Sequence, residues 1–433
     1  MLLKRLQLGL IHVAVAMTLV PINSTLNRVM IKELAVSATL VALLASLPYL
    51  FSPIQVAIGS FSDRHPMLGL RRSPYIALGL LLCVLGVVLS PQAAFLLGNN
   101  FWAGFGLGLV TFGAWGMGFN FATVSYLSLA SELSGEKGRG KTIAVMWFMM
   151  ISSIIITAIV LSQMVEPYTP QALGRAFWII GLAALVLGSL GLAGLERRSV
   201  GGQASYEGYS WGFMLTAILE NRQARLFFWY LTILLAAILG QDILLEPFGG
   251  EAFGMSVQAT TRITSLWGSC VLLALLLAGA LEGRLGKRNV ARWGAWCALL
   301  GFALIVVSGL TLSQAVFYLG LVLLGAGTGL STVSNLSLML DMTTVENVGL
   351  FMGAWGMSNA VSRLVGTILG GVVRDGVNQV AGNPLVGYMT VFAIEAGLLA
   401  VSLLLLRRID VGAFQKKAAS ISIVERAAMA GEV

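Results

Sequence analysis

Four charged residues, Arg28, Asp242, Glu246 and Arg363, interrupt stretches of the chain that are otherwise apolar. Asp242 and Glu246 are four positions apart, so a continuous helix would present both on one face. At the helical rise per residue, Asp242 and Arg363 would lie about 24 Å and about 22 Å from the cytoplasmic ends of their helices. Isolated charges at such depth in a membrane are costly, so we expect these residues to form a charge cluster. Such pairing would serve equally well as structural glue or as a gate.

The composition indicates that the elements positioning these charges are membrane helices. Hydrophobic residues make up 57% of the 433-residue chain and charged residues 11%, whereas a soluble domain carries about 25% charge. The mean hydropathy is +0.87. With two histidines, and three cysteines that all fall in apolar stretches, the chain offers no His-rich metal site and no disulfide framework. We therefore expect neither a soluble enzyme nor a metal centre.

Apolar stretches of membrane length predict twelve transmembrane helices. The predicted domains are an N-terminal six-helix bundle over 1–195, a cytoplasmic linker over 196–225, a C-terminal six-helix bundle over 226–406 and a cytoplasmic tail over 407–433. The expected spans are 8–27, 37–60, 74–91, 101–130, 142–164 and 176–195, then 226–247, 258–281, 293–311, 315–340, 348–373 and 388–406.

The distribution of basic residues predicts the orientation. If both termini are cytoplasmic, all but six of the 27 lysines and arginines fall in cytoplasmic segments. Cytoplasmic loops of membrane proteins carry such an excess, so we expect an inner-membrane protein with both termini inside. The net charge of +8 is accounted for in this way and does not call for a nucleic-acid partner.

An internal repeat supports two similar halves. Thr123–Leu129 closely matches Thr332–Leu338, about half a chain further on. A parallel repeat of six plus six helices is the arrangement of the major facilitator transporters. The expected fold class is therefore an all-α polytopic membrane protein with the major facilitator fold.

The loop between the second and third spans resembles the major facilitator signature. Gly59, Asp63 and Arg64 are followed by the basic pair Arg71 and Arg72. Asp63 could pair with a basic side chain across the domain boundary and stabilise one gate state. The alternative is an ordinary basic loop on the cytoplasmic side.

Gly135–Thr142 matches the phosphate-binding P-loop pattern, but we do not expect it to bind ATP. The pattern needs a preceding β-strand and a following helix, whereas here it joins two apolar helices. We interpret it as a short basic loop.

Four further stretches resemble one branch of the facilitators. Gln241–Gly250 is similar to a ten-residue stretch of the PucC-like bacteriochlorophyll delivery family, and it is the most specific of the four. Thr25–Met30, Arg71–Ile76 and Arg374–Gly376 resemble other segments of that family. The resemblance covers residues 6 to about 406, nearly the whole chain.

This resemblance implies a factor for assembling light-harvesting complexes that binds or delivers chlorophyll or bacteriochlorophyll. Its partners would be membrane lipid, the pigment and antenna or photosystem polypeptides, in a cytoplasmic, intracytoplasmic or thylakoid membrane. Purple-bacterial members tend to have a histidine where this chain has Asn120, so the kind of pigment stays open. The alternatives are a proton-coupled transporter of small molecules and a pigment-free chaperone for antenna helices.

A pigment needs flat apolar walls and an axial ligand for its magnesium, and we expect such a site between spans one, four, seven and ten. Glycines at 113, 116, 118, 325, 327 and 329 would leave room for the ring. His12 is the only histidine in an apolar stretch, although a histidine hydrogen-bonded within the bundle is the commoner case. The candidate pigment-binding residues are His12, Trp115, Asn120, Gln241, Asn335 and Trp355.

Overall fold

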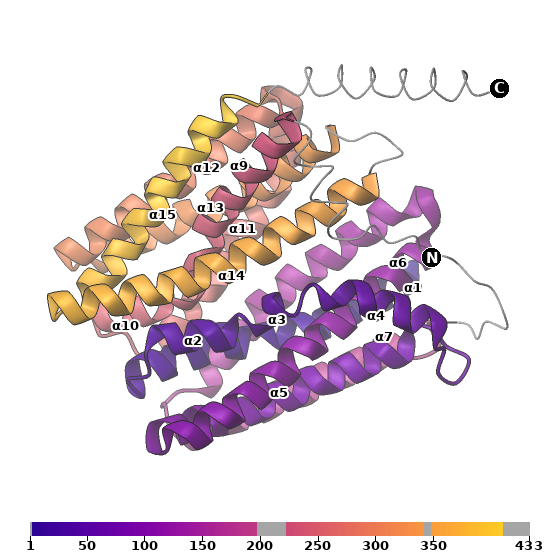
Figure 1. The fold of residues 1–433 in the computed structure, drawn as a ribbon, viewed down its shortest axis with the longest axis horizontal. Coiled ribbons are helices and arrows are strands. Elements are labelled where there is room, and N and C mark those ends of the chain that lie inside the picture. Colours follow the sequence, from indigo (N-terminus) through magenta and orange to yellow (C-terminus); the bar gives the residue numbers. More distant parts are fainter. Residues whose placement is uncertain (1, 197–221, 342–347, 410–433) are drawn as a thin grey trace.

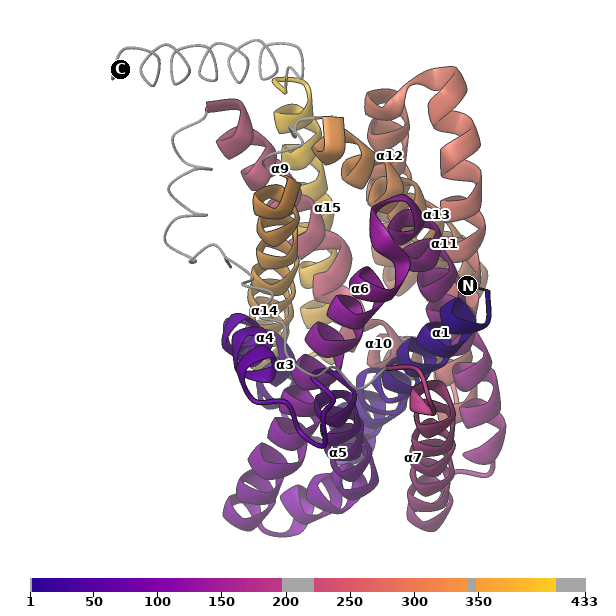
Figure 2. The same cartoon turned by 90° about the vertical axis from the view of Figure 1, so that its right-hand side faces the viewer.

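The computed structural model describes residues 2–196, 222–341 and 348–409, and every long element in these ranges is a helix. Figure 1 shows two bundles, one built from the first half of the chain and one from the second. The turned view in Figure 2 shows the same division. The bundles are the two six-helix halves of a major facilitator fold.

The N-terminal half contains six spans, some of them broken. One long helix, α6, contains two spans and departs from helical geometry at Gly135, where φ is 61°. The elements are α1 (Leu2–Met17), the π-helical segments η1 (Pro21–Leu26) and η2 (Val29–Glu33), α2 (Ala38–Ala45), α3 (Leu47–Leu50), α4 (Ile54–Arg64), α5 (Ser73–Asn99), α6 (Phe101–Met164) and α7 (Pro170–Leu192).

The C-terminal half repeats this order with one marked break. Its elements are α9 (Arg222–Gly240), the 3₁₀ turn η3 (Gln241–Ile243), α10 (Leu245–Phe253), α11 (Val257–Leu285), α12 (Lys287–Thr311), α13 (Gln314–Asp341), α14 (Val348–Ala381) and α15 (Pro384–Leu406). Among the described residues, ten helices are long and apolar enough to cross a membrane.

Prolines lie at three places where an expected span departs from regular α-helix. A proline ring inside a helix clashes with the carbonyl four residues earlier. Pro21 accordingly begins a π-helical segment after α1 ends at Met17, and Pro48 lies at the start of the four-residue α3. Pro247 lies four residues after Ile243, where the 3₁₀ turn ends, so Asp242 and Glu246 stand on opposite sides of a helix break.

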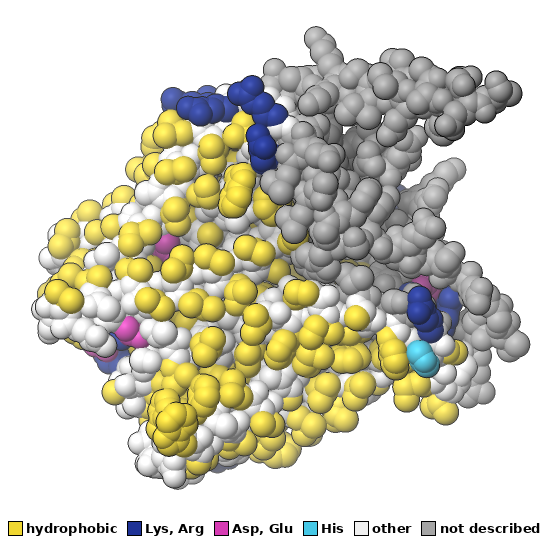
Figure 3. All heavy atoms as spheres, viewed as in Figure 1, with side chains coloured by type: hydrophobic (Ala, Val, Ile, Leu, Met, Phe, Trp, Pro, Cys, Tyr) yellow, Lys and Arg dark blue, Asp and Glu magenta, His cyan; other side chains and the backbone are white. Residues whose placement is uncertain are grey.

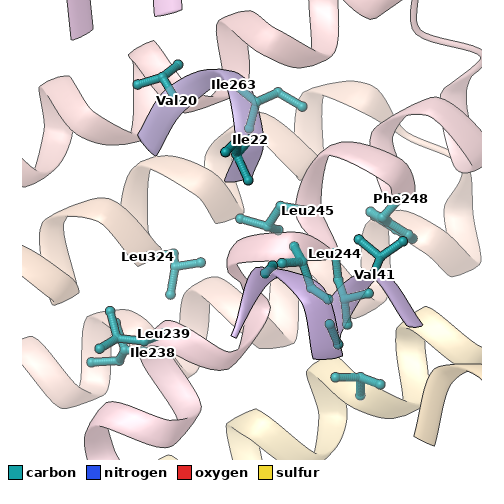
Figure 4. Packing of buried hydrophobic residues seen from close by; sticks show 14 of the residues in the cluster. Val20, Ile22, Val41, Ile238, Leu239, Leu244, Leu245, Phe248, Ile263 and Leu324 are labelled. Atoms are coloured by element: carbon teal, nitrogen blue, oxygen red, sulfur yellow. The ribbon is translucent and has the colours of Figure 1, made fainter. Parts of the chain in front are cut away.

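The largest buried apolar cluster is shared by the two halves. Figure 4 shows Val20, Ile22 and Val41 of the first half packed among Leu244, Phe248 and other residues of the second. A second cluster lies wholly in the N-terminal half, around Leu8, Ile11 and Leu80. Burial of apolar surface between helices therefore supports both each half and the contact between them.

The surface is apolar over the body of the molecule and basic at its margins. Figure 3 shows hydrophobic side chains spread across the face in view, with lysine and arginine confined to the edges. Trp102, Leu273, Leu276 and Leu310 are among the large hydrophobic residues that are more than half exposed. A surface of this kind suits a lipid environment, so the chain is an integral membrane protein.

Candidate functional site

A cavity of ≈ 150 Å³ lies where the helix break of the C-terminal half faces the π-helical segment of the N-terminal half. About half of its lining residues have charged or polar side chains. The lining residues are Leu19, Val20, Asn23, Ser24, Ile154, Gln241, Asp242, Leu245, Glu246, Ile263, Thr264, Trp267 and Arg363.

Asp242 and Arg363 form an ion pair in the wall of this cavity. Arg363 on α14 donates to Asp242 Oδ2 at 2.6 Å and approaches the Tyr49 hydroxyl at 3.4 Å. Its guanidinium also lies 5.5 Å from the centre of the Tyr49 ring. Gln241 Nε2 donates to the other carboxylate oxygen of Asp242 at 3.1 Å. Because Tyr49 belongs to the first half, this pair connects the two halves at the cavity.

Glu246 lies across the helix break from that pair and is buried, with 3% of its surface exposed. Its Oε1 accepts a hydrogen bond from Thr264 on α11. Its Oε2 is buried and has no hydrogen-bond partner, as is also true of Gln241 Oε1 and Trp267 Nε1. With Ser24 Oγ, four buried polar atoms of the lining residues thus lack partners, which marks the cavity as a place for water or a polar ligand.

Arg28 does not join the Asp242–Arg363 pair. It donates to Glu33 at 2.8 Å and to the Met255 carbonyl at 3.2 Å. Its guanidinium lies so close to Gly250 that a Cβ atom there would stand 2.6 Å from Arg28 Nε, so a larger residue would have to displace the guanidinium. The four charges predicted to cluster are therefore divided between the cavity and a second contact beside it.

That second contact holds one end of the two halves together. Lys32 of η2 donates to the Gly250 carbonyl of α10, and the Thr25 and Thr261 hydroxyls are 2.9 Å apart. Nearby, in the loop before α7, burial and the Glu33 carboxylate raise the pKa of Tyr168, opposed by Arg28.

Asp375 extends this contact to α2. Its carboxylate accepts from Ala38 N at 3.2 Å and from Thr39 N and Oγ1 at 2.8 Å each. It thus caps the first turn of a helix in the opposite half, where unpaired N–H groups favour an anion. Arg374 pairs with Asp375 at 2.8 Å and covers the Tyr388 ring at 4.7 Å. We refer to Arg28, Lys32, Asp375 and the groups they contact across the halves as the inter-half lock.

Sequence reasoning missed most of this lock. Arg374 and Asp375 stood out only as part of a motif, while Lys32 and Glu33 gave no signal beyond their positions after an apolar stretch. Thr264 and Trp267 of the cavity were also missed, because a threonine and a tryptophan in an apolar helix are unremarkable.

Arg71 and Arg72 of the signature loop contact acidic residues of the N-terminal half. Arg72 donates to Glu132 at 3.2 Å and to Ser62 at 2.7 Å, and it approaches the Gly59 carbonyl. The Arg71 amide donates to Glu196 at 2.8 Å, and the Arg71 side chain lies 3.7 Å from Glu132. Arg64 is exposed. The side chain of Asp63, which we expected to pair across the halves, lies outside the described residues.

The P-loop-like segment Gly135–Thr142 falls at the break in α6. Thr142 is buried, and its hydroxyl accepts from Arg5 at 3.1 Å and bonds to Ser134 at 2.7 Å. The hydroxyl that would hold a magnesium–nucleotide in a P-loop is therefore used in packing α1 against α6.

Several candidate pigment ligands are occupied by internal bonds. Asn120 accepts from Gln55 and donates to the carbonyls of Pro48 at 2.9 Å and Gly116 at 2.8 Å. Asn335 accepts from the Tyr230 hydroxyl at 2.7 Å. Trp115 is fully buried and donates to Thr18 at 3.2 Å, and Trp355 is half-buried beside the shared core. These contacts give Asn120, Asn335 and Trp115 packing roles.

His12 is the candidate with an unpartnered ring nitrogen, whereas Gln241 Oε1 and Asn335 Nδ2 are unpartnered amide atoms. His12 is 6% exposed and its Nδ1 has no hydrogen-bond partner. Its ring centre lies 4.9 Å from that of Tyr126 and 6.4 Å from that of Trp147, which is exposed. The residue thus presents an unused imidazole nitrogen between two aromatic rings.

The cavity is not the pigment site that we expected between spans one, four, seven and ten. Its walls come from spans one, five, seven, eight and eleven. Seven of the thirteen lining residues have polar or charged side chains, although most of the lining surface is apolar. The glycines expected to leave room for a ring instead let helices pack closely. A Cβ atom at Gly118 would lie 2.6 Å from Cys83 N, and one at Gly327 would lie 2.4 Å from Ala298 N. Of the six, Gly113 alone has open space beside it.

Comparison with known proteins places these features in a family. Residues 25–414 match the family described as PUCC protein. The chain is 33% identical to Protein PucC of Rhodobacter capsulatus over 424 residues, covering 92% of this chain and 90% of that protein. It is 26% identical to a protein of the same organism named Bacteriochlorophyll synthase 44.5 kDa chain, covering 86% of this chain and 87% of that protein.

Solved structures of similar shape are transporters. The crystal structure of the nucleoside transporter NupG has a TM-score of 0.72 and covers 94% of this chain and 98% of that one. At 17% sequence identity this likeness shows the major facilitator fold alone.

Proposed function

Because this chain belongs to the PUCC protein family, we propose that it is a light-harvesting complex assembly factor that binds or delivers chlorophyll or bacteriochlorophyll. The names of its relatives support this: one is called a bacteriochlorophyll synthase chain, and another an uncharacterized protein in the puhA-bchM intergenic region. The role is proposed to be non-catalytic, as the transporter fold of its structural neighbours suggests. The membrane would be an inner, intracytoplasmic or thylakoid membrane, with both termini cytoplasmic.

The observation that carries the pigment role is the unpartnered imidazole of His12. A neutral imidazole nitrogen is a good metal ligand, and a buried one without a partner needs a compensating contact. Tyr126 and Trp147 flank it with aromatic surface of the kind on which a flat macrocycle stacks. We propose His12 as the axial ligand to the pigment magnesium, with Trp147 as one wall of the site.

The polar cavity is not proposed as the pigment site. Its volume of ≈ 150 Å³ equals that of a cavity that accommodates benzene, and a ring of four pyrroles is several times larger. Its wall also carries the charges of Asp242, Glu246 and Arg363, which an apolar macrocycle would leave without solvent. Pigment handling and the charged cavity are therefore assigned to different places.

The deciding experiment measures the pigment retained by gently purified protein from pigment-producing cells. His12→Ala is expected to lower the pigment-to-protein ratio at least tenfold. His65→Ala changes the other histidine, which is exposed at the end of α4, and is the matched control expected to retain pigment. Colourless wild-type protein, together with normal antenna assembly in the His12→Ala strain, would contradict pigment binding and favour a pigment-free chaperone for antenna helices.

The competing proton-coupled transporter of small solutes makes a different prediction. It would give saturable uptake of a polar solute into vesicles without any effect of pigment supply. The pigment role predicts that antenna assembly fails in the absence of the protein while solute uptake is unchanged. Antenna or photosystem polypeptides are the proposed protein partners, detected by co-purification with the wild type.

A further inference from the structure

Three acidic side chains surround the break between α9 and α10, and only one basic side chain pairs with any of them. Asp242 pairs with Arg363 at 2.6 Å. Glu246 and Glu395 are both buried, at 3% and 4% exposure, and make no ion pair among the described residues. Uncompensated carboxylates are costly at membrane depth, so the charge balance of this region requires bound protons or cations.

Glu395 and Glu246 differ in access. Glu395 stands on α15 next to Gly240, whose Cβ would lie 3.1 Å from Glu395 Oε1, and it does not line the cavity. Glu246 lines the cavity, and its Oε2 has no partner. Glu246 is therefore the carboxyl that can exchange a proton with water in the cavity.

Arg28 and Arg363 are the basic side chains near Glu246, and neither forms an ion pair with it among the described residues. Arg28, beside α10, is held by Glu33 and the Met255 carbonyl, and Arg363 on α14 is held by Asp242. The other walls face it with neutral side chains: Thr264 and Trp267 from α11, Ser24 from η1 and Ile154 from α6. A proton on Glu246 removes the unpaired charge without moving either arginine from its partner.

The cavity also provides for water next to this carboxyl. Its ≈ 150 Å³ accommodates several water molecules, since one occupies about 30 Å³ in the liquid. Gln241 Oε1 can accept and Trp267 Nε1 can donate a hydrogen bond, and neither has a partner in the protein. Water held by these atoms would connect Glu246 to the Asp242–Arg363 pair.

We propose that the cavity is a proton-binding site in which Glu246 takes up a proton from cavity water and returns it there as the two halves move. The proton comes from solution and is relayed through the cavity water, which stays neutral, to the Glu246 carboxylate. Since the cavity is bounded by both halves, a change in their contact alters the surroundings of Glu246. Proton binding at Glu246 thereby couples to the positions of the halves, whatever the cargo.

The test is infrared difference spectroscopy of pigment-free purified protein during a pH titration. The wild type is expected to show a protonated-carboxyl band whose intensity changes with pH, and Glu246→Gln to lose that change. Glu395→Gln is the matched control, because it neutralises a buried carboxyl away from the cavity. It is expected to keep the pH-dependent band.

Two further variants test the surroundings of Glu246. Added salt tests whether the site binds a metal cation instead of a proton. Thr264→Val keeps Glu246 but removes its hydrogen-bond donor, so it is expected to displace the midpoint of the band and keep its amplitude. Trp267→Phe tests the cavity water and is expected to change the band shape in deuterium exchange. An unchanged pH-dependent band in Glu246→Gln, or a band that disappears on adding sodium chloride at fixed pH, would overturn the proposal. Pigment retention plays no part in these readings, so they can fail independently of the pigment role.

Discussion

The two ends of the molecule use their polar residues differently. At the end formed by η2, α2, α10 and the last turns of α14, polar side chains bond across the halves, as Asp375 does to α2 and Lys32 to α10. At the end that carries the loops after α4 and α11, the described polar contacts stay within one half. There Arg72 bonds to Glu132, and Lys287 bonds to Asp341 at 2.6 Å.

This difference indicates which end is held closed. Separating the halves at the locked end breaks hydrogen bonds that cross between them, such as those from Thr39 to Asp375 and from Lys32 to the Gly250 carbonyl. A facilitator alternates between states by rocking its halves about a central site. The structure thus represents a state closed at the locked end, and three substitutions test this comparison.

The largest effect is expected from Asp375→Ala. It removes the cap of α2 from the opposite half and leaves Arg374 buried without its carboxylate partner. Breaking a buried pair in this way costs about 3–5 kcal/mol. The matched control at the loop end is Lys287→Ala, whose partly exposed pair with Asp341 is worth about 0–1 kcal/mol. Thermal unfolding in one detergent compares the two, and equal losses would contradict the assignment of the lock.

A smaller effect is expected from the Asp242–Arg363 pair at the cavity. Asp242→Asn and Arg363→Gln should each impair antenna assembly, and the double variant should lose less than the sum. The coupling free energy is expected to be about 0.5–3 kcal/mol, as for side chains in direct contact. Antenna absorbance is measured in the wild type, the two single variants and the double variant, which together form a double-mutant cycle. Strict additivity of the losses would show that the pair does not act as a unit.

The smallest effect is expected from Thr25→Val. It removes one neutral hydrogen bond to Thr261 across the halves, worth about 0.5–1.5 kcal/mol. Thr142→Val removes bonds to Arg5, Ser134 and the Gly138 carbonyl inside the N-terminal half. Both should lower the unfolding temperature slightly, but only Thr25→Val should raise proteolysis between the halves. Equal protease sensitivity would mean that Thr25 does not hold the halves together.

Much of the fold follows from the sequence, because hydropathy and charge act locally. Apolar stretches of membrane length and the repeat around Thr123 and Thr332 predicted the all-helical facilitator fold, which the comparisons with solved transporters confirm. Pro247 could also have predicted the helix break, since its ring disfavours a regular helix through residue 243.

The site could be predicted only in part, because its pairings connect distant residues. The predicted depth along each helix placed Asp242 near Arg363. Depth alone could not show that Arg363, and not Arg28, is the partner of Asp242. The bond from Thr39 to Asp375 joins residues 336 positions apart, and no local pattern specifies it. The six glycines expected to leave room for a pigment ring could not be interpreted for a similar reason. Whether a glycine leaves space or admits a neighbouring helix depends on that neighbour.

Distances between spin labels test two things together: the proposal that this protein binds a pigment, and the expectation that the loop end moves while the locked end stays closed. One pair, at Leu40 and Val380, reports on the locked end, and another, at His65 and Leu285, reports on the loop end, in protein whose three native cysteines are replaced. On adding bacteriochlorophyll in lipid nanodiscs, the account predicts a changed distance distribution at the loop end, none at the locked end, and no change in His12→Ala. Pigment that leaves both distributions unchanged, or that widens the locked end alone, would contradict it.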